Sequence, residues 1–139
     1  MVSKELQEKA MEFELLRQQV SAVQQELMEL QNRLAELDMI KTTLSEIKGN
    51  KNQEVMLPLG GGVLVNAVLK NDKVLVGVGG NVLIERDVET AKENIDAQFK
   101  QFDKRVMVLE RNFEQFNARM AELEPILERL TREEKERKK

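Results

Sequence analysis

The 139-residue sequence has no cysteine, histidine, tryptophan or tyrosine, and phenylalanine is its only aromatic residue type. Without cysteine the chain can form neither a disulfide framework nor a thiol site. Because histidine is missing as well, the composition favours neither a tight metal cage nor acid–base catalysis. We therefore expect no enzyme activity, no cofactor and no metal. A compact globule uses more aromatic residues in its core, so the low aromatic content points towards a long coiled coil.

The sequence also lacks a long apolar run and a field of one charge. Its N-terminal segment is charged from Lys4 onward and has no apolar core of signal-peptide length. Its longest apolar stretch, residues 63–69, is interrupted by Asn66 and is far shorter than the ~20 residues of a membrane span. The 22 basic and 25 acidic residues are interspersed, so no face resembles a nucleic-acid site. We expect a cytoplasmic protein with neither membrane nor nucleic acid as partner.

Two segments of equal length, residues 3–48 and 88–133, carry apolar residues at an alternating spacing of three and four. This spacing places one apolar seam along a helix and is typical of coiled coils. Ser3 and Asp87 are plausible N-caps, and Gly49 after Lys48 marks the end of the first helix. The seam of the first helix comprises Leu6, Phe13, Leu16, Val20, Val23, Leu27, Leu30, Leu34, Leu37 and Leu44. That of the second comprises Ile95, Phe99, Phe102, Val106, Leu109, Phe113, Phe116, Met120, Leu123, Leu127 and Leu130.

The segment between the helices, residues 55–86, is rich in Val, Leu and Ile and is punctuated by Gly, Asn and Asp. This pattern predicts four strands, at 55–59, 63–69, 73–78 and 82–86, which form two β-hairpins. Such hairpins are marginal alone and expose edges that attract other strands, so we expect them to pair with other subunits. The expected oligomerisation residues are Leu57, Leu59, Val63, Val65, Leu75, Val76, Val78, Val82 and Ile84.

The equal helix lengths predict a single domain, 1–139, in which the two helices pair antiparallel and bring both ends of the chain together. Residues 134–139 are expected to be a flexible tail. Near this tip, Met11 and Leu15 lie off the seam, four residues apart and therefore adjacent on the helix surface. One interpretation is that such groups only cap the coil. The other is an adaptable apolar surface for unfolded chains, formed by Met1, Val2, Leu6, Met11, Leu15, Leu123, Ile126, Leu127 and Leu130.

The order of coil, two hairpins and coil resembles the archaeal alpha-type subunit of prefoldin over essentially the whole chain. The resemblance rests on Leu57-Pro58-Leu59-Gly60, on residues 73–79 and 82–86, and on Glu89, Ala91 and Ile95 at the start of the second helix. It implies a fold of class α+β, a long antiparallel coiled-coil helical hairpin whose two central β-hairpins join an intersubunit β-barrel. It also implies a hexamer with four beta-type subunits and two alpha-type subunits.

The resemblance further implies an ATP-independent holdase that captures unfolded client proteins and passes them to a group II chaperonin. A structural spacer or adaptor that presents a specific folded partner is the alternative, and it would ignore chemically diverse unfolded clients. A periplasmic tentacle chaperone would share the plan of arms on a β body. The absence of a recognisable signal sequence and the acidic balance count against that third interpretation.

Overall fold

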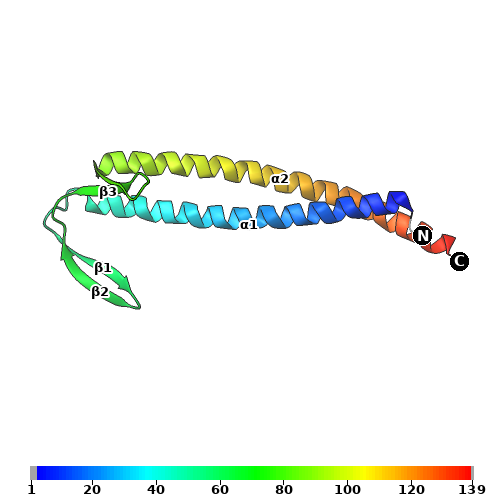
Figure 1. Cartoon of the computed structure of the whole chain (residues 1–139), viewed down its shortest axis with the longest axis horizontal. Coiled ribbons are helices and arrows are strands. Elements are labelled where there is room, and N and C mark those ends of the chain that lie inside the picture. Colours follow the sequence, from blue (N-terminus) through cyan, green and yellow to red (C-terminus); the bar gives the residue numbers. More distant parts are fainter. Residues whose placement is uncertain (1–2, 139) are drawn as a thin grey trace. The chain divides into compact units, whose positions relative to one another are not determined.

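The computed structural model describes residues 3–138 and contains two long helices and four strands (Figure 1). In chain order these are α1 (Lys4–Ile47), β1 (Glu54–Gly60), β2 (Val63–Val68), β3 (Lys73–Gly77), β4 (Leu83–Asp87) and α2 (Val88–Arg137). The chain divides into two compact units, one from residues 3–32 and 103–138 and the other from residues 33–102. Both helices contribute to both units. The predicted fold class of two long helices with two antiparallel hairpins is confirmed, whereas the barrel concerns several chains and stays a prediction.

In the first unit α1 and α2 run antiparallel and bury the predicted apolar seam. Leu16 and Val23 of α1 and Val106, Leu109, Leu123 and Leu130 of α2 are buried there. Contacts between the helices show the direction of pairing, because Arg105 bonds to Glu26, Arg119 to Glu12, and Ser3 to Glu134. Charged side chains flank the seam, which is the usual arrangement of a coiled-coil pair.

The second unit has its core where the β3–β4 hairpin meets the adjoining helix ends. Leu44 of α1 and Val88 and Ala91 of α2 are buried, and Ile47, Ile95, Val74 and Val76 pack against them. Lys41 on the seam of α1 forms an ion pair with Asp96 of α2, Nζ to Oδ1 2.8 Å. The cation at this level of the seam is thus neutralised across the helix pair.

The strands form two separate two-stranded antiparallel sheets, β1–β2 and β3–β4. Val55 pairs with Ala67 and Leu57 with Val65, and the register shifts between Pro58 and Gly60. In the second sheet Val76 pairs with Ile84. Gly61, at the tip of the first hairpin, has φ 59°, a conformation that glycine adopts without the steric cost met by other residues.

The helix ends follow the expected caps, with one correction at the C-terminal end. Leu6 N donates to Ser3 Oγ (3.2 Å) and Thr90 N donates to Asp87 Oδ1 (2.7 Å), so both predicted N-caps are confirmed. Gly49 has φ 78° just after α1 ends. The residues expected as a flexible tail from Glu134 are instead helical through Arg137. The seam continues one step beyond Leu130 to Glu134, which is only 8% exposed and bonds to Ser3.

Candidate functional site

The expected client-binding residues lie in the first unit, around the end where α1 begins and α2 finishes. Met11 and Leu15 are exposed, at 73% and 56%. Leu6, Ile126 and Leu127 are half-buried, so each offers part of its side chain to the surface. Met1 and Val2 lie outside the described residues. Exposed apolar groups on α1 and half-buried ones on both helices therefore remain as candidates for a contact surface.

Two of the expected client-binding residues need correction. Leu123 is 0% exposed and Leu130 is 4% exposed. Both occupy the seam between α1 and α2, where burial of an aliphatic side chain stabilises the helix pair. A side chain enclosed in this way cannot touch another protein unless the helices separate, so we assign both leucines to the core.

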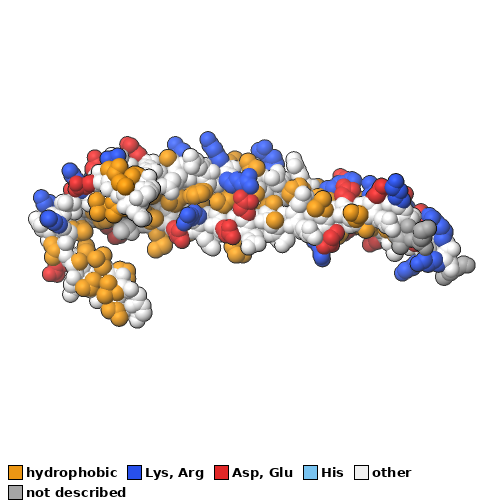
Figure 2. Space-filling view, viewed as in Figure 1, with side chains coloured by type: hydrophobic (Ala, Val, Ile, Leu, Met, Phe, Trp, Pro, Cys, Tyr) orange, Lys and Arg blue, Asp and Glu red, His pale blue; other side chains and the backbone are white. Residues whose placement is uncertain are grey.

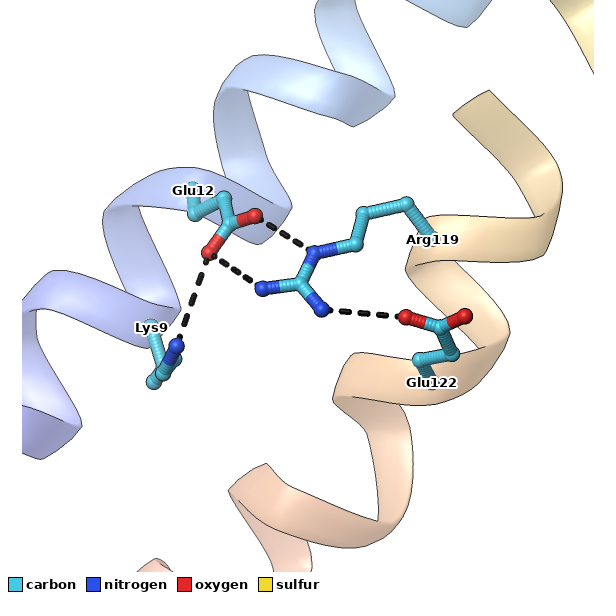
Figure 3. A network of polar contacts seen from close by, with 4 residues as sticks. All are labelled: Lys9, Glu12, Arg119 and Glu122. Atoms are coloured by element: carbon cyan, nitrogen blue, oxygen red, sulfur yellow. Dashed lines mark hydrogen bonds and ion pairs between the residues drawn. The ribbon is translucent and has the colours of Figure 1, made fainter. Parts of the chain in front are cut away.

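A network of charged side chains joins α1 and α2 near this end of the first unit (Figure 3). Arg119 of α2 donates from Nε to Glu12 Oε1 (2.7 Å) and from Nη2 to Glu12 Oε2 (3.2 Å). A third bond runs from Arg119 Nη1 to Glu122 Oε2 (3.0 Å), and Lys9 Nζ lies 4.0 Å from Glu12 Oε2. The two-pronged contact fixes the guanidinium in one orientation. It joins the helices directly beside the exposed apolar pair, since Glu12 follows Met11 and precedes Leu15 by three residues.

These ion pairs shift the protonation equilibria of their members. The hydrogen bond from Arg119 lowers the pKa of Glu12 below its usual 4.5, although partial burial opposes the shift. Glu12 and Glu122 accept hydrogen bonds from the Arg119 guanidinium, and these bonds raise the pKa of Arg119 further above its already high value. Both groups are charged at neutral pH, so the edge of this surface presents a fixed polar boundary rather than a group poised for proton transfer.

The same end of the first unit is closed by a contact between the two helices. Ser3 N donates to Glu134 Oε2 at 3.3 Å, while Ser3 Oγ accepts from Leu6 N. The carboxylate thus satisfies a backbone N–H at the N-terminus of α1, where the helix leaves donors free and favours negative charge. Glu134 caps α1 from the other helix. Its place on the seam, four residues after Leu130, follows from the spacing in the sequence, whereas its contact with Ser3 does not.

The second candidate surface lies on the two hairpins. Leu57, Leu59, Val63, Val65, Leu75, Val78 and Val82, all expected in oligomerisation, are exposed, at fractions from 42% to 68%. Orange side chains cover much of the β1–β2 hairpin in Figure 2. Large exposed apolar patches mark interaction sites, and here the patch coincides with strands whose edges are open.

Two of the expected oligomerisation residues are placed differently by the structure. Val76 packs against the buried cluster of Leu44, Val88 and Ala91, so it belongs to the core of this chain. Ile84, its partner across the sheet, is half-buried. Side chains alternate between the faces of a strand, so the inner face of β3–β4 is occupied by the chain's own helices. Its outer face carries Leu75 and Leu83, at 66% and 60% exposure.

Sequence reasoning missed four exposed apolar residues of the hairpins, Met56, Leu64, Val68 and Leu83. Three of them belong to one face of β1–β2, because Met56 pairs with Asn66, Leu64 with Pro58 and Val68 with Glu54. The opposite face carries Val55, Leu57, Val65 and Ala67. Both faces of this hairpin are therefore largely apolar. The signal was a run without polar alternation, which indicates a strand buried on both sides.

A hollow of ≈ 430 Å³ lies between the end of α1 and strand β1. Ile47, Val55, Leu57 and Leu69 supply its apolar lining, and Thr43 and Glu46 lie at its helical side. In residues 3–138 no group of three or more acidic, histidine or cysteine side chains could hold a metal ion. Polar side chains of Asn50, Gln53 and Glu54 also line the hollow, so its surface is mixed. Within the same described range, no helix has the length and apolarity needed to cross a membrane.

Comparison with known proteins shows which family shares this architecture. A family model described as prefoldin subunit matches residues 16–133. The prefoldin subunit alpha of Methanobrevibacter smithii is 28% identical over 93 residues, which cover 66% of this chain and 64% of that relative. A filamentous prefoldin from Methanocaldococcus jannaschii, solved by cryo-electron microscopy, superimposes with a TM-score of 0.70 and 26% identity, covering 82% of this chain and 96% of that one. By the extent of the family match, the chain belongs to the prefoldin family.

Proposed function

We propose that this chain is a subunit of an ATP-independent chaperone that holds unfolded proteins and passes them to a group II chaperonin. The observation that carries the proposal is the exposed pair Met11 and Leu15 at the capped end of the paired helices. An unfolded chain offers aliphatic and aromatic side chains, and contact with this pair would remove apolar surface of both partners from water. Methionine suits varied clients because its unbranched side chain adapts its shape. No catalytic step is part of the proposal.

The surface on a single subunit is small, so one arm would hold a client weakly. Full burial of an aliphatic side chain contributes only about 1.5–3 kcal/mol. In an assembly, the paired helices of several subunits would bind the same client together. Because these contacts are joined in one assembly, the overall affinity is well above that of each contact. Oligomerisation through the hairpins is therefore part of the function. The proposal also includes a cytoplasmic location and association with beta-type subunits, two alpha-type with four beta-type.

A substitution experiment separates the proposed surface from the rest of the helix. Met11→Gln combined with Leu15→Gln keeps good helix formers while removing the apolar character. We expect this double variant to require about tenfold more protein to suppress aggregation of a chemically unfolded client. Suppression is measured by light scattering with several unrelated clients, since a spacer for one folded partner would ignore them all.

The matched control is Met39→Gln with Ile40→Gln on the same helix, where the side chains are also exposed, at 71% and 45%. This variant should suppress aggregation as the unaltered chain does. Helix content from circular dichroism and the mass of the assembly should be the same for both double variants. Full suppression by the Met11/Leu15 variant would refute the proposed surface.

A further inference from the structure

The outward side of α1 carries a second regular row of side chains, apart from the seam that packs against α2. Its members follow one another at intervals of three or four residues and therefore share one stripe of the helix. They are Met11, Leu15, Gln18, Ala22, Gln25 and Met28. All six are exposed, whereas Leu16 and Val23 of the seam are buried. This row, called here the α1 ridge, begins at the proposed client surface and continues along the same helix.

The middle of the α1 ridge has no charge. Charged residues make up 34% of the chain, yet none occurs between Arg17 and Glu26. Both of these flanking charges have partners. Arg17 Nη2 lies 2.8 Å from Glu14 Oε1, and Glu26 Oε1 lies 2.9 Å from Arg105 Nε. Because the solvent-facing side of a helix usually carries charged residues, the ridge departs from the pattern that solubility alone would favour.

The neighbouring stretch of α2 does not share this property. Interhelical bonds at Glu12 and Glu26 place residues 105–119 of α2 beside this part of α1. Besides the two arginines that make those bonds, the stretch exposes three charged side chains, Glu110, Arg111 and Glu114. The lack of charge is thus a property of one face of the helix pair and not of this level of the coil. Helix α1 is the one that offers a neutral surface.

Glutamine gives this neutral surface the hydrogen-bonding groups of a peptide. A primary amide has two N–H donors and a carbonyl acceptor. In an unfolded protein the backbone offers one acceptor at every residue and one donor at every residue except proline. The amides of Gln18 and Gln25 can therefore bond to an extended segment whatever its side chains are. Met11, Leu15 and Met28, exposed at 73%, 56% and 65%, supply apolar contacts at the two ends of the row.

We propose that the α1 ridge binds one extended segment of an unfolded client along its length. Apolar side chains of the segment contact Met11 and Leu15 at one end and Met28 at the other. The client backbone between them bonds to Gln18 and Gln25. From Met11 to Met28 the helix rises about 26 Å, which an extended chain spans with about eight residues. This inference rests on the proposed chaperone function and names the form of polypeptide that the surface takes.

An extended segment is the occupant that matches the chemistry of the row. A helical segment uses its backbone groups internally and would leave the two amides without backbone partners. A strongly charged ligand would find no opposite charge in residues 18–25. The row is also continuous with Met11 and Leu15, so a client held there reaches the amides by extending along the same helix. Since the contacts are neutral, binding should change little with salt.

Fluorescence anisotropy with designed peptides tests the length and form of the segment. The probe is a fluorescein-labelled, uncharged peptide of eight residues, with two leucines at each end and serine and threonine between them. We expect it to bind the full chain, in its assembly, about tenfold more tightly than a four-residue peptide with two leucines. Its affinity should change less than twofold between low and high salt. Equal affinity of the two peptides, or helical chemical shifts of the bound peptide labelled with carbon-13, would overturn the proposal.

Added charge tests the position of the segment. Gln18→Glu combined with Gln25→Glu keeps good helix formers but removes the amide donors and makes the row negative. We expect about tenfold weaker binding of the eight-residue peptide. The matched control, Gln115→Glu combined with Ala118→Glu, adds two charges at exposed positions of α2 and should bind the peptide as the unaltered chain does. Equal weakening in both variants would contradict a site on α1.

A modified peptide tests the backbone bonds directly. N-methylation of its central residues removes N–H donors and should weaken binding to the unaltered chain. The variant with Gln18→Ala and Gln25→Ala has already lost the partners of these groups, so N-methylation should have a smaller effect on it. The assignment of the bonds to these glutamines fails if N-methylation weakens both complexes equally.

Met28→Gln separates this inference from the proposed function. If this variant binds the eight-residue peptide and suppresses aggregation as the unaltered chain does, while the Met11/Leu15 variant fails, the ridge is refuted and the chaperone proposal stands. If the peptide binds to the ridge but the unaltered chain has no effect on the aggregation of unfolded proteins, the ridge is supported and the chaperone proposal is refuted.

Discussion

At the scale of single residues, Leu123 shows how the helix pair divides structural from surface roles. It is fully enclosed between α1 and α2, whereas Leu15 is 56% exposed. Leu123→Ala would leave a cavity in the seam, and we expect a loss of about 2–5 kcal/mol in the free energy of unfolding. Leu15→Ala should change it by less than about 0.5 kcal/mol. Urea denaturation of both variants measures the difference, and equal losses would contradict the assignment of Leu123 to the core.

The bond between Glu12 and Arg119 predicts a pH dependence of stability. In the unfolded chain the Glu12 carboxyl has its usual pKa of 4.5, and in the folded chain Arg119 lowers that pKa. As the pH falls the unfolded state takes up the proton first, so stability is lost from about pH 4.5 downward and is fully present at neutral pH. Asp87, whose pKa is lowered by the backbone N–H of Thr90, acts in the same direction.

Glu12→Gln should therefore show a smaller fall in melting temperature between neutral pH and acid pH than the unaltered chain. Glu14→Gln is the control, because Glu14 pairs with Arg17 of its own helix. Thermal unfolding followed by circular dichroism at a series of pH values gives the comparison. The interpretation fails if Glu12→Gln follows the pH profile of the unaltered chain.

At the scale of elements, the start of α2 depends on one side chain. Asp87 Oδ1 accepts from Thr90 N (2.7 Å), and the next residue, Val88, is buried in the core cluster of the second unit. Asp87→Ala would leave a backbone donor without this partner and should lower the melting temperature. Asp87→Asn and Asp87→Ser retain an acceptor and should recover most of the loss. A variant with alanine as stable as the unaltered chain would show that the cap contributes nothing.

The elements themselves could be predicted because each has a local cause. The seam spacing, the caps at Ser3 and Asp87 and the glycine-containing turns placed the strand and helix boundaries within one residue, except at the end of α2. That end was missed because Glu134 has the appearance of a surface residue, and its partner, Ser3, is remote in sequence. Contacts between distant positions are not encoded in local periodicity. The same reason explains why Val76 could not be assigned to the core from its strand alone.

At the scale of the whole molecule, association should be measurable as stability. Isolated two-stranded sheets are marginal, and both hairpins expose apolar side chains. Burial of these side chains between copies would stabilise the folded state by mass action, so the melting temperature should rise with protein concentration. Differential scanning calorimetry over a wide concentration range tests this expectation. A melting temperature independent of concentration for the unaltered chain would speak against association through these sheets.

The candidate surfaces could be predicted only in part. The sequence located the exposed pair Met11 and Leu15 because both lie off the seam. It could not separate Leu123 from the surface set, because a seam residue near a helix end has the same pattern whether it is enclosed or open. On β1–β2 only one face was expected, and the second, with Met56 and Val68, appeared once the register was known.

The exposure of methionine has a chemical consequence for the proposed client surface. Met11, Met28 and Met107 of the first unit present 57–73% of their side chains to solvent. Peroxide would convert such accessible thioethers to sulfoxides, which are polar and chiral. Oxidation would thereby weaken the affinity of Met11 for apolar segments of an unfolded client without altering the enclosed leucines. An enzyme that reduces methionine sulfoxide would restore this affinity.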